Sequence, residues 1–188
     1  MMKTKDTFVR MNTLVNRTAS GRVSSTGARK LAQYCAFGRG TQAEQAARPQ
    51  RGIWHDQTAK PRSHEDVLAW VKSQGQEHPY TYQFILSVKH LELSALDYGQ
   101  AMKAGGQEMF PSWMLMAHTD SDYSHAHVLA FGDKDIRIKS ADFQQWRNQV
   151  QTALSQFQER RLREELEQEN RHQELHRESR RSLGLGLG

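Results

Sequence analysis

The chain of 188 residues has a single cysteine and no long hydrophobic run. Cys35 cannot form an internal disulfide, which fits a reducing, cytoplasmic environment. No apolar stretch approaches the roughly 18 residues of a membrane-spanning helix, so the sequence predicts no membrane insertion. The N-terminus, Met-Met-Lys-Thr-Lys-Asp, is charged but lacks a following apolar segment, and so does not predict a secretory signal.

Acidic residues are scarce in the first third of the chain. Residues 1–62 contain 12 lysines and arginines but only three acidic residues, although the net charge of the whole chain is only +5. The rest of the chain is therefore net acidic. A basic N-terminal third favours a polyanionic partner, nucleic acid first, but a solubilising arm would have the same composition. The charge alone leaves both interpretations open.

The hydrophobic pattern predicts an α+β fold with a central, mostly antiparallel sheet flanked by helices, followed by a C-terminal helical extension. Caps and turn residues delimit these elements. We expect strands at 6–15, 80–88, 113–117, 125–131 and 135–139, and helices at 24–35, 63–75, 93–109 and 140–157.

Residues 1–158 are expected to form one domain, with a mobile loop at 41–62. That loop is rich in Gln, Ala, Arg and Pro, and Trp54 is its only large apolar residue. Residues 159–188 are expected to form a charged tail, either helical or disordered. Their leucines do not sustain a heptad, and Glu and Arg alternate at spacings that suit a solvated helix.

Three histidines gather at a predicted hairpin between residues 110 and 132. His125 and His127 are two positions apart on a strand, so their side chains share a face at a spacing of roughly 7 Å. His118 ends the preceding strand, and antiparallel pairing would bring it beside them. Three imidazoles in this arrangement could hold one metal ion. Because the chain has nine histidines, chance proximity explains the spacing equally well.

The helix expected at 24–35 carries Tyr34 among positive charges. Tyr34 shares a face with Leu31 and Cys35, which favours packing against the sheet when the helix is considered alone. Arg22, Arg29, Lys30 and Arg39 form a cluster around it that could bind the phosphates of single-stranded DNA.

The order of these motifs resembles a known family. His118-x-Asp120, followed by His125-x-His127 and Val-Leu-Ala-Phe, is similar to the three-histidine motif of conjugative relaxases, the mobilisation nucleases of the HUH endonuclease superfamily. The segment 24–34 resembles the early helix that carries the catalytic tyrosine in mobilisation-protein and T-DNA-border-type relaxases. The resemblance spans residues 8–155 and departs at Ser124, often proline in the family, and at Ala126, usually a bulky hydrophobic residue.

This resemblance implies a relaxase that nicks one strand of single-stranded DNA at a plasmid transfer origin through a 5′-phosphotyrosine intermediate. Tyr34 would be the nucleophile, and Asp120 would orient a ligand imidazole. His118, His125 and His127 would hold a divalent ion, magnesium or manganese in the family, although imidazole ligands also suit zinc and nickel. Accessory or coupling proteins of DNA transfer would be further partners.

Several alternatives remain. Tyr123 lies in the histidine hairpin and competes with Tyr34 as nucleophile, whereas Tyr80 and Tyr82 belong to a core-type strand. In the rolling-circle replication and transposition nucleases of the same superfamily the tyrosine usually follows the histidines, but no tyrosine follows Tyr123 here. A catalytically weak or inactive DNA-binding accessory protein, and a metal-binding protein unrelated to nucleic acid, are the other two interpretations.

Overall fold

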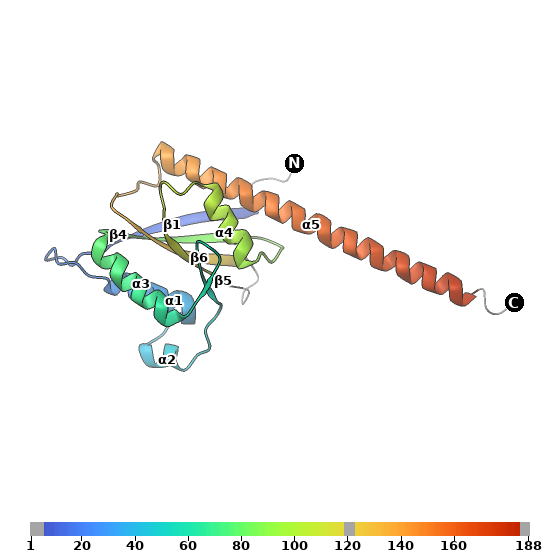
Figure 1. Cartoon of the computed structure of the whole chain (residues 1–188), viewed down its shortest axis with the longest axis horizontal. Helices are drawn as coiled ribbons and strands as arrows, with labels where there is room; N and C mark the ends of the chain where they lie inside the picture. The colour runs from blue at the N-terminus through green and yellow to red at the C-terminus, as the bar shows by residue number, and fades with distance from the viewer. Residues whose placement is uncertain (1–5, 119–122, 185–188) are drawn as a thin grey trace.

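The computed structural model describes residues 6–118 and 123–184, with side chains up to residue 179. These residues form one antiparallel sheet with helices on both of its faces and a long C-terminal helix that projects from the body (Figure 1). The predicted α+β class with a helical extension is therefore confirmed.

The sheet has six strands in the order β1-β4-β6-β5-β2-β3, and every neighbouring pair is antiparallel. The long strands β4 and β6 lie in its interior, so the histidine hairpin of β5 and β6 is central. The strands are β1 (Thr7–Val15), β2 (Trp54–Asp56), β3 (Pro61–Arg62), β4 (Tyr80–Val88), β5 (Trp113–His118) and β6 (Ser124–Gly132).

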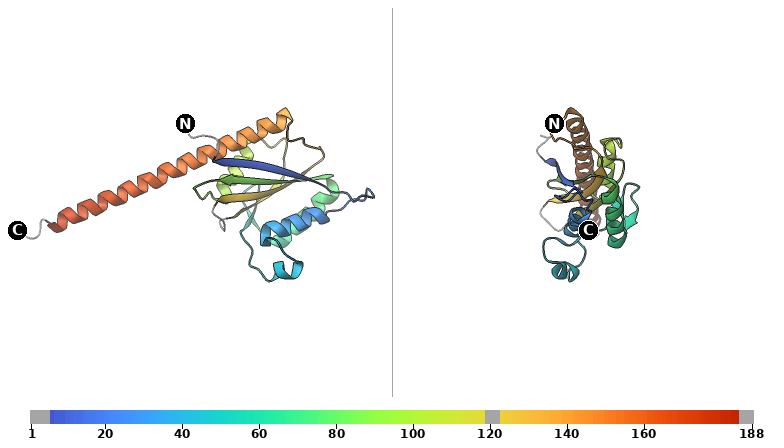
Figure 2. Two further views of the ribbon diagram at one scale, coloured as in Figure 1. Left: turned by 180° about the vertical axis from the view of Figure 1, so that it is seen from behind. Right: turned by 90° about the vertical axis from the view of Figure 1, so that its left-hand side faces the viewer.

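Alternation along β6 divides its side chains between two cores. Ala126, Val128 and Ala130 belong to the core beneath α4 and the first part of α5, whereas Leu129 and Phe131 pack with α1 and α3. The two helical layers lie on opposite sides of the sheet (Figure 2). The helices are α1 (Thr26–Phe37), α2 (Gln42–Ala46), α3 (His64–Glu77), α4 (Ala95–Ala104) and α5 (Ala141–Gly184).

Local chemistry explains where the helices begin. The Ser63 hydroxyl accepts a hydrogen bond from the backbone of Asp66 at the start of α3, and Ser94 forms a reciprocal capping box with Asp97 at the start of α4. Gly75, expected to close α3, instead lies inside it. A Cβ there would lie 2.7 Å from the Cβ of Ser25, so glycine lets α3 approach the start of α1.

Two further expectations differ from the structure. Residues 135–139 form no strand, because β4 and β5 already occupy both edges of β6 and leave no partner for a third hairpin strand. The segment 41–62, expected to be an irregular loop, contains α2, β2 and β3. Trp54 is fully buried in this segment, and β2 adds to the sheet beside β5.

α5 runs unbroken from the core into the region expected to be either a helical or a disordered tail. Where it leaves the body, Arg160 and Arg161 bind the buried carboxylate of Asp97 at 3.2 and 3.3 Å. Beyond these arginines the helix is exposed and rich in charge. Across the described residues, none of the helices combines the length and apolar character needed to cross a membrane.

Candidate metal centre

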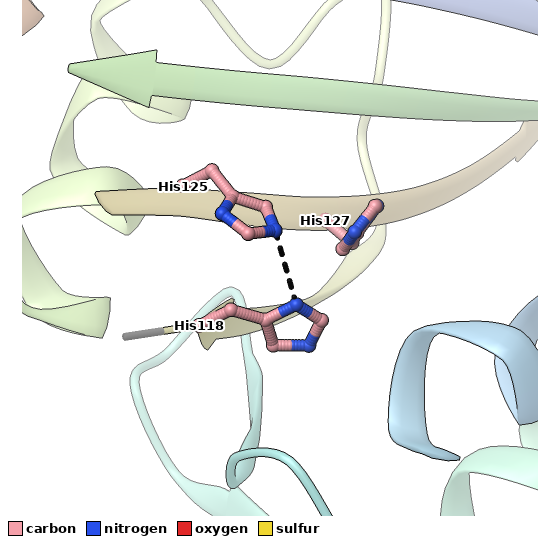
Figure 3. Close-up of side chains that lie close together, drawn as sticks. All are labelled: His118, His125 and His127. Atoms are coloured by element: carbon pink, nitrogen blue, oxygen red, sulfur yellow. Dashed lines mark hydrogen bonds between the residues drawn. The ribbon is translucent and has the colours of Figure 1, made fainter. Parts of the chain in front are cut away.

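The three histidines lie on the sheet face that α1 covers in part. His118 is the last residue of β5 and pairs directly with His125 of β6. His127 is two positions further along β6, between Met116 of β5 and Ile85 of β4. Because paired residues and residues two apart share a face, the three side chains converge (Figure 3).

The distances within this histidine cluster are close to those of a metal site. Nδ1 of His118 lies 3.2 Å from Nε2 of His125, and one nitrogen from each ring lies within 4.8 Å of the others. A tetrahedral ion with bonds of about 2.0–2.1 Å separates its ligand atoms by about 3.4 Å. His118 and His127 are buried and His125 is half-buried. The cluster could therefore hold a metal ion.

Backbone and amide groups orient two of the rings. Nδ1 of His125 lies 3.1 Å from the carbonyl oxygen of Tyr123, to which it donates, so Nε2 carries the lone pair. That lone pair points toward His118. Nδ1 of His127 lies 3.3 Å from the side-chain amide of Gln83 on β4. Such outer hydrogen bonds fix the ring orientation of metal-binding histidines.

Helix α1 brings Tyr34 to the histidine cluster. The ring of Tyr34 stands edge-on to that of His127, with centroids 6.0 Å apart and planes at 81°. Small residues on the buried face of α1 allow its close approach to the sheet: Ala28, Ala32, Cys35 and Ala36. Two residues far apart in sequence are thus neighbours at one site.

Cys35, beside Tyr34, is fully buried between α1 and the sheet. Burial raises the pKa of its thiol to about 12, although a hydrogen bond from Gln83 lowers it in part. Gln83 therefore contacts both α1 and His127. Gln83 was not predicted as a site residue, because its only signal in the sequence is that it is a polar residue within a core-type strand.

A pocket of about 520 Å³ adjoins Tyr34. Tyr34 and three of the four predicted DNA-binding residues, Arg29, Lys30 and Arg39, line it, together with parts of α2 and α3. We call this the basic pocket. Arg22 lies outside it, in the turn between β1 and α1, where its backbone N–H donates to the hydroxyl of Thr18.

Two further arginines lie near the C-terminal end of α1. Arg48 donates to the carbonyls of Phe37 and Arg39, and the backbone N–H of Arg51 donates to the carbonyl of Ala36 at 2.8 Å. Positive charge at this end of a helix complements its dipole. Both residues belong to the segment 41–62, which was expected to be a loop, and neither was predicted as a site residue.

The segment after these arginines passes close to β5. A Cβ on Gly52 would lie 2.4 Å from the carbonyl oxygen of Ala117, the residue before His118. Only glycine permits that approach. The 41–62 segment therefore supports the histidine cluster from the β5 side.

The other four tyrosines of the chain differ in burial. Tyr82 and Tyr98 are buried, and burial raises the pKa of each phenol to about 12. Tyr80 packs on the α4–α5 side of the sheet, at the far end of β4 from the histidines. Tyr123 directly precedes β6 and its side chain is 49% exposed. Asp120 lies outside the described residues.

Comparison with known proteins assigns the chain to no family. A scan against protein-family models finds no match, and a search of curated proteins finds no similar sequence.

Proposed function

We propose that this protein is a metal-dependent DNA relaxase that nicks single-stranded DNA at a plasmid transfer origin and remains joined to the 5′ end. The observation that carries the proposal is the contact between Tyr34 and the histidine cluster, 6.0 Å between the centroids of Tyr34 and His127. A nucleophile of the right type adjoins a candidate metal site, and a cationic pocket adjoins the nucleophile.

In the proposed reaction, the Tyr34 hydroxyl oxygen attacks the phosphorus of one phosphodiester. A tyrosine–phosphate bond forms, and the bond from phosphorus to the 3′ oxygen breaks. The phenolic proton leaves the tyrosine, and the departing 3′ oxygen gains a proton to become a free hydroxyl. Because the covalent intermediate is itself a phosphodiester, the same or another 3′-hydroxyl can later rejoin the strand.

Each group in the site has a part in this scheme. Arg29, Lys30 and Arg39 attract the DNA backbone to the pocket beside Tyr34. The three imidazoles would hold a divalent ion, which would supply Lewis-acid stabilisation of charge on the phosphate. Gln83 and the Tyr123 carbonyl hold the imidazoles in position.

The arrangement favours Tyr34 over Tyr123 as nucleophile. The Tyr34 ring contacts a histidine ring and lines the basic pocket, whereas Tyr123 contributes its backbone carbonyl to His125. A tyrosine that precedes the histidines in sequence also favours a relaxase over a rolling-circle or transposition nuclease. The proposed setting is the cytoplasm, with accessory or coupling proteins of DNA transfer as partners.

A covalent-adduct experiment tests the proposal. The full chain is incubated with manganese and single-stranded oligonucleotides that tile the candidate transfer origin of the host element, then run on a denaturing gel. We expect an adduct with the wild type and with Tyr123→Phe, and none with Tyr34→Phe. An adduct that survives Tyr34→Phe but not Tyr123→Phe would move the nucleophile to Tyr123. The absence of any adduct would favour the accessory-protein alternative.

A further inference from the structure

Among the described residues, no helix covers the β1 side of the sheet face on which α1 lies. Along β1, Val9 and Met11 are buried beneath α5, whereas the alternate residues Phe8, Arg10 and Asn12 are exposed on the other face. Phe8, a large aromatic residue, is 50% exposed. The helices α1 and α3 therefore leave the β1 side of this face uncovered.

Strand register places this open area beside the histidine cluster. Phe8 pairs with Ser87 of β4, Ser87 pairs with His125, and His125 pairs with His118, so the four residues form one row across the sheet. Arg10 belongs to the next row on the same face, which runs through Ile85 to His127. With strands about 4.8 Å apart, Phe8 is about 10 Å from His125.

A second exposed aromatic residue lies at the same end of the sheet. Tyr123 directly precedes β6, and the amine of Lys89 lies 6.0 Å from its ring centroid. Lys89 directly follows β4, and its backbone N–H donates to the carbonyl of Asp6, beside Phe8. Two aromatic rings and two cations, Arg10 and Lys89, thus occupy the open area, and the acidic residue Asp6 lies at its margin among the described residues.

We propose that Phe8, Arg10, Lys89 and Tyr123 form an aromatic shelf on which the bases of a single strand of nucleic acid stack as it enters the histidine cluster. The inference rests on the proposed function and adds a second contact surface to the basic pocket. Exposed aromatic rings offer stacking to any base, and neighbouring cations hold the phosphates. Duplex DNA has its bases paired and stacked, so the shelf selects single strands.

The occupant follows from the chemistry of the shelf. An apolar patch would suit a protein partner. Here Lys89 lies beside the Tyr123 ring, Arg10 shares an exposed face of β1 with Phe8, and the first third of the chain is strongly basic. This combination matches the alternating bases and phosphates of a single strand. The shelf gives Tyr123 a role distinct from that of Tyr34: it binds a base, whereas Tyr34 attacks a phosphate.

Binding measured without cleavage tests the shelf. Fluorescence anisotropy of labelled oligo(dT) of about 20 nucleotides, a length that covers typical sites for single strands, is recorded with the full chain in EDTA. We expect Phe8→Ala to weaken binding by about 5- to 150-fold, the range for losing one stacked base, and Phe8→Trp to retain it. Arg10→Gln should also lower the slope of log affinity against log salt by about 0.7.

Leu96→Ala is the matched control. Leu96 is 54% exposed, close to the value for Phe8, but lies on α4 on the opposite side of the sheet. Three results would overturn the shelf. Phe8→Ala could bind as tightly as the wild type, or Phe8→Ala and Leu96→Ala could lose equal affinity. The third is that the wild type does not bind oligo(dT).

The adduct experiment separates this proposal from the nuclease proposal. Shelf-dependent binding by a protein that forms no adduct would support the shelf and exclude nicking. If the wild type forms an adduct but Phe8→Ala does not change the affinity for oligo(dT), the result would support nicking and exclude the shelf.

Discussion

The side-chain amide of Gln83 lies 3.3 Å from Nδ1 of His127, and the same glutamine also hydrogen-bonds the buried Cys35 of α1. One residue of β4 thereby joins the histidine cluster to the helix that carries Tyr34. Its amide has both a donor and an acceptor end, so it can pair with either neutral tautomer of the imidazole. Gln83 is buried, and its removal would leave these partners without that hydrogen bond.

Gln83→Leu should therefore weaken metal binding. Loss of an outer hydrogen bond to a ligand histidine costs about 10- to 100-fold in metal affinity, so we expect a loss in that range for zinc or manganese. Isothermal titration calorimetry on the purified chain measures it. Gln149→Leu, an exposed glutamine on α5, is the control and should bind metal as the wild type does. Unchanged affinity in Gln83→Leu would mean that the amide does not orient His127.

Metal should also stabilise the fold through the histidine cluster. A ligand at 100 times its dissociation constant adds about 2.7 kcal/mol to the free energy of unfolding. In a chain of this size that raises the melting temperature by about 5–10 °C. We expect this rise for the wild type, its reversal by EDTA, and its loss in His125→Ala.

His172→Ala is the control for the melting experiment, because His172 lies on the exposed part of α5. It should show the full rise in melting temperature.

In the cleavage assay His125→Ala should form no adduct while binding single-stranded DNA nearly as well as the wild type. Equal loss of DNA binding and cleavage would show that the histidines are structural.

The thiol of Cys35 reports how firmly α1 packs on the sheet. Burial raises its pKa to about 12 from 9.0. At pH 8 the thiolate fraction is thus much smaller than for an ordinary thiol, and the thiolate is the reactive form. We expect labelling by a thiol reagent to be slow in the native protein and fast in urea. Fast native labelling would show that α1 opens readily and does not hold Tyr34 in place.

Stability at acid pH should depend on Asp97. Burial raises the pKa of this carboxyl, but hydrogen bonds from Ser94 and Arg161 outweigh burial and hold it below its ordinary value of 3.8. A depressed pKa in the folded state contributes stability that is fully present above the ordinary value and is lost as the pH falls through the folded value. Asp97→Ala should cost about 1.5–3 kcal/mol at pH 7, the range for hydrogen bonds to a charged group.

Urea unfolding of the wild type and Asp97→Ala at several pH values checks this. The difference in the free energy of unfolding should be constant from pH 7 to 5 and should shrink below pH 4. Asp142→Ala, an exposed aspartate in the first turn of α5, should show a much smaller difference at every pH. A difference for Asp97→Ala that does not change with pH would mean that the carboxylate charge contributes nothing.

The histidine cluster could be predicted from the sequence because it depends on patterns that extend over only a few residues. Alternation along one strand and a hairpin between two strands suffice to bring His118, His125 and His127 to one face. The start of α3 at Ser63 could be predicted for the same reason, since a cap is decided within four residues.

Contacts between residues far apart in the chain could not be predicted from the sequence. Nothing near Gln83 in sequence indicates that it will lie beneath His127 and Cys35, because strand order is decided by packing of the whole sheet. The segment 41–62 lacks periodicity, so the pairing of Trp54 with Met116 in β2 and β5 could not be anticipated. The expected strand 135–139 shows the converse: its local alternating pattern forms no strand, because β6, the strand before it, is already paired on both sides by β4 and β5.

Gly52 offers a test of how tightly that segment supports the site. In Gly52→Ala the new Cβ would lie 2.4 Å from the carbonyl oxygen of Ala117 and 3.0 Å from Cγ of Met116. Either the segment or the end of β5 must move, and β5 ends at His118. We therefore expect a lower melting temperature and, because one ligand is displaced, weaker metal binding, measured by thermal denaturation and calorimetry.

Gly27→Ala is the matched control for Gly52→Ala. Gly27 lies inside α1 with nothing within 4 Å of a Cβ placed on it. Alanine has fewer conformations than glycine in the unfolded chain, so this variant should melt at an equal or slightly higher temperature and bind metal normally. If Gly52→Ala lowers stability but leaves metal affinity unchanged, the segment can yield without moving His118, and its role is confined to closing the edge of the sheet.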